Sequence, residues 1–131
     1  MVHFENSYIN GKLSETRVLP DIINYFKTDI KINPEQYGKY DFTDSTTQYE
    51  LKTRTNTLSK YPDTLITFNK CSTEQDLILL FAFTDCLTYI KYNKETFSHY
   101  KKKMFSRANL KQDEKLHVYI PIEDLILIRQ F

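Results

Sequence analysis

Glycine and cysteine are scarce in this chain: Gly11 and Gly38 are the only glycines, and Cys71 and Cys86 the only cysteines, among 131 residues. A glycine-rich phosphate-binding loop is therefore excluded on composition. The two cysteines lie far apart and lack partners at metal-binding spacing, so neither a disulfide framework nor a zinc site is indicated. Long apolar runs are also missing, since the longest, residues 77–83, is far shorter than the roughly 20 residues of a membrane span.

What the composition does contain is ordinary for a soluble protein. Hydrophobic residues make up 40% and charged residues 27% of the chain, and a chain of this length is expected to fold as one domain with a real core. The first residues lack the basic and apolar regions of a secretory signal, so we expect an intracellular protein without membrane contact. Abundant Asn, Ile, Lys and Tyr hint at an AT-rich genome, such as that of a virus or mobile element.

Charge is unevenly distributed along the sequence. Residues 1–50 contain eight acidic and five basic side chains, whereas residues 91–115 contain eight basic and three acidic ones. An acidic half beside a basic half suits a metal site next to a phosphate-binding surface. The alternative is that the basic segment is simply a solvated, lysine-rich helix.

The most informative stretch consists of two short segments, residues 40–43 and 49–54, joined by a polar turn. We interpret it as a β-hairpin. In a strand, successive side chains point to opposite faces of the sheet. The second segment therefore places Glu50, Lys52 and Arg54 together on one face.

The predicted register of this hairpin brings two carboxylates together. With Ser45 and Thr46 as the central turn residues, Asp41 lies opposite Glu50, and facing residues of an antiparallel pair have Cβ atoms roughly 4.5–5.5 Å apart. Carboxylates that close repel each other unless a cation lies between them. Mg²⁺, or Mn²⁺ in its place, is the natural candidate, because hard cations are held by one or two carboxylates plus substrate phosphate oxygens. Asp44 competes with Asp41, but its position at the turn favours bonds to its own backbone unless the register slips by one residue.

The remaining hydrophobic pattern predicts an α/β domain with a mixed central β-sheet flanked by helices. A helical stripe of apolar residues covers residues 13–27. Residues 77–83 are apolar on both faces, as in a central strand, and residues 86–92 return as its partner. A basic helix is predicted over residues 94–107. The other expected elements are a loop at residues 59–63, strands at residues 64–68 and 116–120, and a helical turn at residues 122–125.

A helix with an acidic residue, then an aspartate strand, then Glu-x-Lys on the adjoining strand resembles the PD-(D/E)xK superfamily of restriction-endonuclease-like nucleases. The matching residues are Asp41 and the run Glu50-Leu51-Lys52, and Glu15 is the candidate for the helix acid. The resemblance covers residues 13–92 and implies a restriction-endonuclease-like fold. Tyr40 departs from the pattern, which has proline before the aspartate.

The resemblance also implies a role for each matching residue. Asp41 and Glu50 would hold Mg²⁺, and the backbone carbonyl of Leu51 would complete the metal shell. Lys52, on the same face, would orient the attacking water or stabilise developing charge. Glu15 either completes the metal site or complements the dipole of its helix after Ser14.

Basic residues outside the motif are candidates for contacts with nucleic acid. Arg54 shares the predicted face of Glu50, and it either binds a phosphate or forms an ion pair with Asp41 or Glu50. The predicted basic helix carries the other candidates, whose phosphate contacts would make binding steeply salt-dependent. These candidates are Lys101, Lys102, Lys103 and Arg107.

Taken together, these observations predict a Mg²⁺-dependent endonuclease that hydrolyses DNA phosphodiester bonds. DNA is then the partner, and a homodimer is plausible because a domain this small usually needs a second copy to cut both strands. The alternative is a catalytically silent nuclease fold that serves as a nucleic-acid-binding or protein-interaction module. That alternative predicts DNA binding that is insensitive to Glu50→Ala and weakened by charge reversal at residues 101–103.

Overall fold

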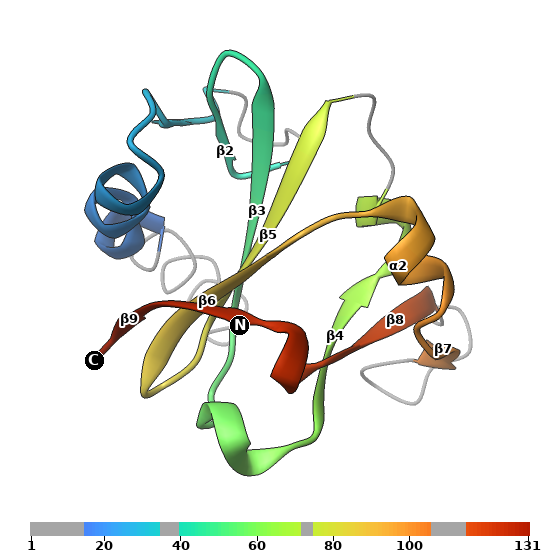
Figure 1. Cartoon of the computed structure of the whole chain (residues 1–131). Helices are drawn as coiled ribbons and strands as arrows, with labels where there is room; N and C mark the ends of the chain where they lie inside the picture. The colour runs from blue at the N-terminus through green and yellow to red at the C-terminus, as the bar shows by residue number, and fades with distance from the viewer. Residues whose placement is uncertain (1–14, 35–39, 72–74, 106–114) are drawn as a thin grey trace, which may run out of the picture.

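A mixed six-stranded sheet forms the centre of the computed structural model, which describes residues 15–34, 40–71, 75–105 and 115–131 (Figure 1). β3 and β5 run parallel to each other, and every other neighbouring pair in the sheet is antiparallel. The strand order is β1-β2-β3-β5-β6-β9. The strands are β1 (Lys31–Ile32), β2 (Phe42–Thr43), β3 (Thr47–Thr53), β5 (Asp76–Ala82), β6 (Cys86–Lys91) and β9 (Ile126–Gln130).

A second, three-stranded sheet has the order β4-β8-β7 and is antiparallel throughout. In Figure 1 it lies on the far side of the large sheet from the N-terminal helix, which is described over residues 15–26. Single turns of 3-10 helix connect several elements. The remaining elements are β4 (Asp63–Thr67), β7 (Lys102–Phe105), β8 (Lys115–Pro121), α2 (Lys94–Ser98), η1 (Leu58–Lys60), η2 (Phe68–Cys71) and η4 (Ile122–Asp124).

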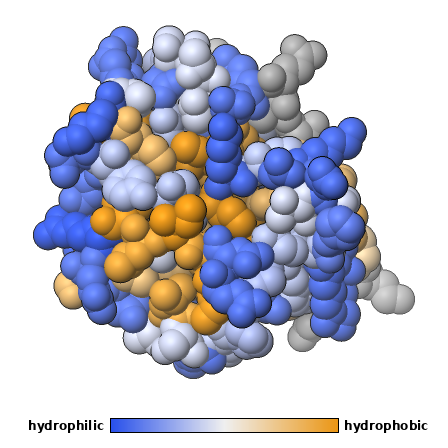
Figure 2. Space-filling model, in the orientation of Figure 1, coloured by the Kyte–Doolittle hydropathy of each residue, from blue (hydrophilic) through white to orange (hydrophobic). Residues whose placement is uncertain are grey.

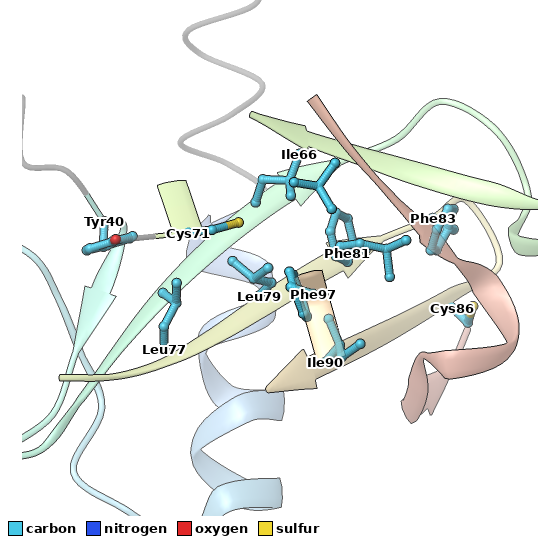
Figure 3. Close-up of a cluster of buried hydrophobic side chains, with 12 residues drawn as sticks. Tyr40, Ile66, Cys71, Leu77, Leu79, Phe81, Phe83, Cys86, Ile90 and Phe97 are labelled. Carbon is cyan, nitrogen blue, oxygen red and sulfur yellow. The ribbon is translucent and has the colours of Figure 1, made fainter. Parts of the chain in front are cut away.

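β5 is buried on both faces, as its continuous apolar run predicts. Its alternating side chains enter two separate clusters. Leu79 and Phe81 pack with Ile66 of β4 and Phe97 of α2 under the three-stranded sheet (Figure 3). On the other face, Leu80 packs in the cluster that contains the helix residues Val18 and Ile22. The fold is thus a single mixed α/β domain of three layers with few helices.

The strand predicted at residues 64–68 is present as β4, and it belongs to the second sheet. β3 is therefore followed in the large sheet by β5, and a parallel pair needs such a long crossover connection. β6 pairs with β5 as predicted. β8 and the helical turn η4 also occur where expected.

The basic helix predicted over residues 94–107 is wrong for residues 99–105, and residues 106 and 107 lie outside the described part of the chain. Asn93 caps α2, whose last residue is Ser98, and the chain then enters β7. Phe97 of α2 is buried, whereas Met104 and Phe105 of β7 are exposed. The spacing of the apolar residues in this segment fits both the helical period and the strand period. Pairing with β8 makes residues 102–105 a strand.

No helix in the described part of the chain is both long and apolar enough to cross a membrane.

Candidate metal and phosphate site

Glu50 projects from the middle of β3 into the layer between the two sheets. Its neighbours Tyr49 and Leu51 point to the opposite face, where they pack with the N-terminal helix, so the alternation predicted for this strand is confirmed. Glu50 pairs in register with Leu79 of β5, and only 3% of its surface is exposed. A carboxylate so deeply buried requires compensating charge or hydrogen bonds.

Asp41 lies just before β2, at the end of the hairpin register. β2 pairs Phe42 with Tyr49, and the backbone N of Asp41 donates to the carbonyl of that same Tyr49 at 3.0 Å. Asp41 therefore leaves the regular ladder. Its carboxylate Oδ2 accepts a hydrogen bond from the backbone N of Leu51 at 2.8 Å, which holds it beside Glu50.

The Asp41 carboxylate affects the ionisation of Glu50. The pKa of Glu50 is raised to about 7, chiefly because burial disfavours its charged form and secondly because of the negative charge of Asp41. A hydrogen bond with Asp41 acts in the same direction, whereas the lysines at positions 52 and 70 oppose it. Near neutral pH Glu50 therefore exchanges a proton easily, and a nearby cation would favour its charged form.

Lys52 and Lys70 both reach the same oxygen of Glu50. Lys52 Nζ lies 3.2 Å from Glu50 Oε2, and Lys70 Nζ lies 3.3 Å from it. Their side chains are 29% and 24% exposed, so both ammonium groups also face solvent. The contact of Lys52 follows from its position two residues after Glu50 on β3, but sequence analysis assigned no role to Lys70.

Tyr40 fixes the segment that carries Lys70. The hydroxyl of Tyr40 donates to the backbone carbonyl of Lys70 at 3.0 Å, and the ammonium of Lys70 lies 5.7 Å from the centroid of the Tyr40 ring. Burial is the main reason why the pKa of Tyr40 is raised to about 12, so its hydroxyl stays a donor. The residue before Asp41 thus positions η2 against the hairpin. Nothing in the local sequence signals this contact, because it joins segments that are distant along the chain.

Asp44 belongs to the turn and not to the carboxylate pair. Its Oδ1 accepts the backbone N–H groups of Thr46 and Thr47 at 2.8 and 2.7 Å. Its Oδ2 accepts the hydroxyls of Tyr49 at 2.7 Å and Thr28 at 3.0 Å. Burial opposes ionisation of Asp44, but the hydrogen bonds from Tyr49 and the turn outweigh it and hold the pKa below its ordinary value.

Glu15 lies on the other side of the large sheet from Glu50. Its helix packs through Val18 and Ile22 against the cluster that contains Leu51, whose side chain points away from that of Glu50. Glu15 is half-buried there. Within the described residues, no group of three or more His, Cys, Asp or Glu side chains is arranged to hold a metal ion. The structure therefore brings Asp41, Glu50 and Lys52 together without Glu15.

Arg54 is engaged where β3 meets the second sheet. Its Nε donates to Thr64 Oγ1 at 3.2 Å, and its Nη2 donates to the carbonyl of Leu65. The guanidinium also lies 5.6 Å from the centroid of the Phe81 ring. Arg54 thus fastens β4 to the end of β3, and its half-buried position leaves part of it facing the surface.

The lysines of residues 101–103 divide between two roles. Lys102 Nζ donates to the carbonyls of Phe97 at 2.9 Å and Tyr100 at 3.0 Å, so this lysine caps the end of α2. Lys101 and Lys103 are exposed, and Lys101 Nζ lies 5.2 Å from the Tyr119 ring. The fourth candidate of this group, Arg107, falls outside the described residues.

No protein-family model matches the chain, and no curated protein or solved structure shows significant similarity to it.

Proposed function

We propose that this protein is a Mg²⁺-dependent endonuclease that hydrolyses phosphodiester bonds of DNA. The proposal is supported above all by one observation: Glu50, 3% exposed, is held beside Asp41 and within 3.2 Å of the Lys52 ammonium. Burying a carboxylate beside a second one is costly unless a cation compensates the charge. Such a cost is expected at a working site rather than at a purely structural one.

The donor set of this site fits a hard divalent cation. Asp41 and Glu50 supply carboxylate oxygens, and the carbonyl of Leu51 adds a third oxygen on the pattern of the restriction-endonuclease-like nucleases. Mg²⁺ is commonly held by one or two carboxylates, with the rest of its shell completed by water and substrate phosphate, and Mn²⁺ accepts the same ligands. When bound, such an ion would acidify a water molecule and neutralise charge on the phosphate.

The protein's own residues supply the remaining requirements. Leu51 N holds the Asp41 carboxylate in place through its 2.8 Å hydrogen bond. Lys52, 29% exposed, points its ammonium toward solvent beside Glu50, where it can orient water or stabilise charge that develops on the phosphate. Only 3% of Glu50 is exposed to bulk water, and this burial strengthens these electrostatic effects.

The proposal is tested by cleavage assays with linear, branched and single-stranded DNA in Mg²⁺ or Mn²⁺. We expect Asp41→Ala, Glu50→Ala and Lys52→Ala each to abolish cleavage while circular dichroism shows a folded protein. Asp76→Ala is the matched control, because Asp76 is an exposed acid that pairs with Lys91 at 3.6 Å. If the wild-type protein cuts none of these substrates with either metal, the proposed activity is wrong.

A second candidate function is a catalytically silent nuclease fold that binds nucleic acid or protein. The observation in its favour is that Lys70 Nζ lies 3.3 Å from Glu50 Oε2, so two lysines already compensate Glu50 without a metal. This alternative predicts binding of DNA that is unaffected by both EDTA and Glu50→Ala. Metal-dependent cleavage that is lost in the Glu50 variant would exclude it.

A homodimer is proposed on the edge formed by β9. β9 ends the large sheet in the described part of the chain, and Ile126 and Leu127 on it are 48% and 50% exposed. Figure 2 shows apolar side chains gathered on the face that carries β6 and β9. Light scattering across a concentration series tests this proposal, and we expect Leu127→Lys to give a monomer if β9 forms the interface.

A further inference from the structure

Cavities with shared lining residues form a groove where the second sheet meets the end of β3. Three adjoining cavities of about 300, 100 and 550 Å³ form it, and Phe105 lines all three. Lys52 and His117 line the first two cavities, and Arg54 lines the last two. We call this feature the inter-sheet groove and define it by Lys52, Arg54, Lys70, Phe105, Lys115 and His117.

The groove is strongly basic at the end near Glu50. Lys52, Lys70 and Lys115 line the same cavity of about 300 Å³ together with His117. No acidic side chain is among the described residues that line this cavity or the adjoining one of about 100 Å³. Lys52 and Lys70 share the one carboxylate of Glu50, which does not line the cavity, so the three ammonium groups leave positive potential there. Such a potential suits a polyanion with regularly spaced charges.

Phe105 presents an aromatic ring in the middle of these cations. It pairs in register with Lys115 on β8 and is 43% exposed. The ring of His117 is nearly perpendicular to the Phe105 ring, with the centroids 5.5 Å apart and the planes at 86°. This edge-to-face contact holds the Phe105 ring in place. An exposed, braced aromatic ring beside lysines is the arrangement on which nucleic-acid bases stack.

The ring also distinguishes one form of nucleic acid from another. In a duplex, each base is covered by its stacked neighbours, and a side chain at the surface meets phosphates and groove edges only. An unpaired strand offers free base faces as well as phosphates. A surface that combines lysines with an exposed phenylalanine therefore favours an unpaired strand.

We propose that the inter-sheet groove binds a single strand of nucleic acid, with phosphates at Lys52, Lys70 and Lys115 and a base stacked on Phe105. Lys52 belongs to both the groove and the Glu50 site, so a strand in the groove would carry a phosphate past Glu50. The role of this groove in cleavage rests on the proposed nuclease function, for which the inference names a substrate class. It selects unpaired strands, such as single-stranded flaps or overhanging ends, as the substrate class.

The stacking contact is tested by fluorescence anisotropy with a labelled oligothymidylate of about a dozen nucleotides in EDTA. Phe105→Ala is expected to weaken binding about tenfold, because base–aromatic stacking contributes on that scale. Met104→Ala is the matched control: Met104 is 57% exposed on the same strand, but it precedes Phe105 and so points to the other face. We expect it to leave affinity unchanged, and equal affinity of the two variants would overturn the proposal.

The phosphate contacts are tested by the salt dependence of the same binding. Lys115→Gln is expected to reduce the slope of log K against log salt by about 0.7, the contribution of one contact to a single strand. Lys91→Gln removes the same charge from β6, where Lys91 pairs with Asp76 outside the groove, and should leave the slope unchanged. A duplex of the same length should bind more weakly, and tighter duplex binding that is insensitive to Phe105→Ala would refute the single-strand assignment.

Two further comparisons distinguish RNA from DNA as the bound strand, and failure of the groove proposal from failure of the nuclease proposal. Oligouridylate compared with oligothymidylate shows whether RNA or DNA is preferred, and Phe105-dependent binding of either supports the groove. Phe105-dependent binding without cleavage in Mg²⁺ or Mn²⁺ would contradict the nuclease proposal and support the groove. Cleavage together with Phe105-independent binding would support the nuclease and overturn the groove.

Discussion

Lys70 Nζ lies 3.3 Å from Oε2 of Glu50, so a lysine from the crossover between β3 and β5 pairs with the carboxylate that β3 buries. Lys52 approaches the same oxygen to 3.2 Å from the strand itself. Two ammonium groups therefore approach a single carboxylate oxygen. We infer that Lys70 is the replaceable partner, because Lys52 belongs to the same strand as Glu50 whereas Lys70 belongs to the crossover segment.

Removal of the Lys70 charge is therefore expected to strengthen metal binding. In Lys70→Gln, Glu50 loses one competing cation, and the Kd for Mg²⁺ should fall about three- to tenfold, a modest effect because both lysines are partly exposed. Isothermal titration calorimetry measures this change directly. Lys91→Gln controls for the loss of net charge, and an unchanged or weaker Mg²⁺ affinity in Lys70→Gln would contradict the competition.

Glu50 should make the metal-free protein less stable as pH rises. Its pKa is raised to about 7 in the folded protein, above the ordinary value of 4.5 in the unfolded chain. The folded state thus binds more protons between these values, and the free energy of unfolding decreases from about pH 5 to pH 7, by on the order of 3 kcal/mol. Urea unfolding at a series of pH values in EDTA measures the slope.

The variant Glu50→Gln isolates this contribution. It keeps the shape of the side chain but cannot ionise, so the decrease in stability between about pH 5 and pH 7 should disappear. Asp76→Asn, which neutralises an exposed carboxylate, should retain the wild-type profile. A Glu50→Gln profile that still falls with pH would assign the titration to another group.

Asp44 is expected to stabilise the hairpin without taking part in cleavage. Its carboxylate accepts hydrogen bonds from Thr46, Thr47, Tyr49 and Thr28, so Asp44→Ala should lower the free energy of unfolding by about 2 kcal/mol near neutral pH. Because the folded pKa is lowered, this stabilisation is present above the ordinary pKa and is lost as pH falls through the folded pKa.

Denaturant unfolding and cleavage measured on the same Asp44 preparation separate stability from activity. Metal-dependent cleavage at a temperature where the variant stays folded should match the wild type. Loss of cleavage comparable to that of Asp41→Ala would instead place Asp44 in the site, as a one-residue slip of register would require.

Lys102 and Lys103 should differ although they are adjacent. Lys102 caps α2 through the carbonyls of Phe97 and Tyr100, so Lys102→Ala is expected to lower stability by about 1–2 kcal/mol. Lys103 is exposed and pairs in register with His117 of the groove, so Lys103→Ala should leave stability unchanged and reduce the salt dependence of oligonucleotide binding. Thermal unfolding and anisotropy titrations give both readouts, and identical behaviour of the two variants would contradict this division.

The central hairpin could be predicted from the sequence because side-chain alternation and hairpin register depend on residues that are close together in the chain. Alternation along β3 correctly separated Glu50 from Leu51, and the apolar run of β5 correctly indicated a strand covered on both faces. Asp41 and Glu50 are linked by a short turn, so their proximity follows from the register of one hairpin. The segment after α2 was predicted incorrectly because its short apolar spacing fits a helix and a strand equally well, and only β8 distinguishes them.

By itself, the sequence determined that two carboxylates and a lysine share one end of a buried hairpin, because side-chain alternation depends only on neighbouring residues. The tertiary structure alone decided that Lys70 joins them, that Glu15 lies on the opposite side of the sheet, and that Phe105 stands in a basic groove. These contacts join segments that are distant along the chain. Their geometry is set by how the crossover and the second sheet pack over β3, which no local pattern encodes.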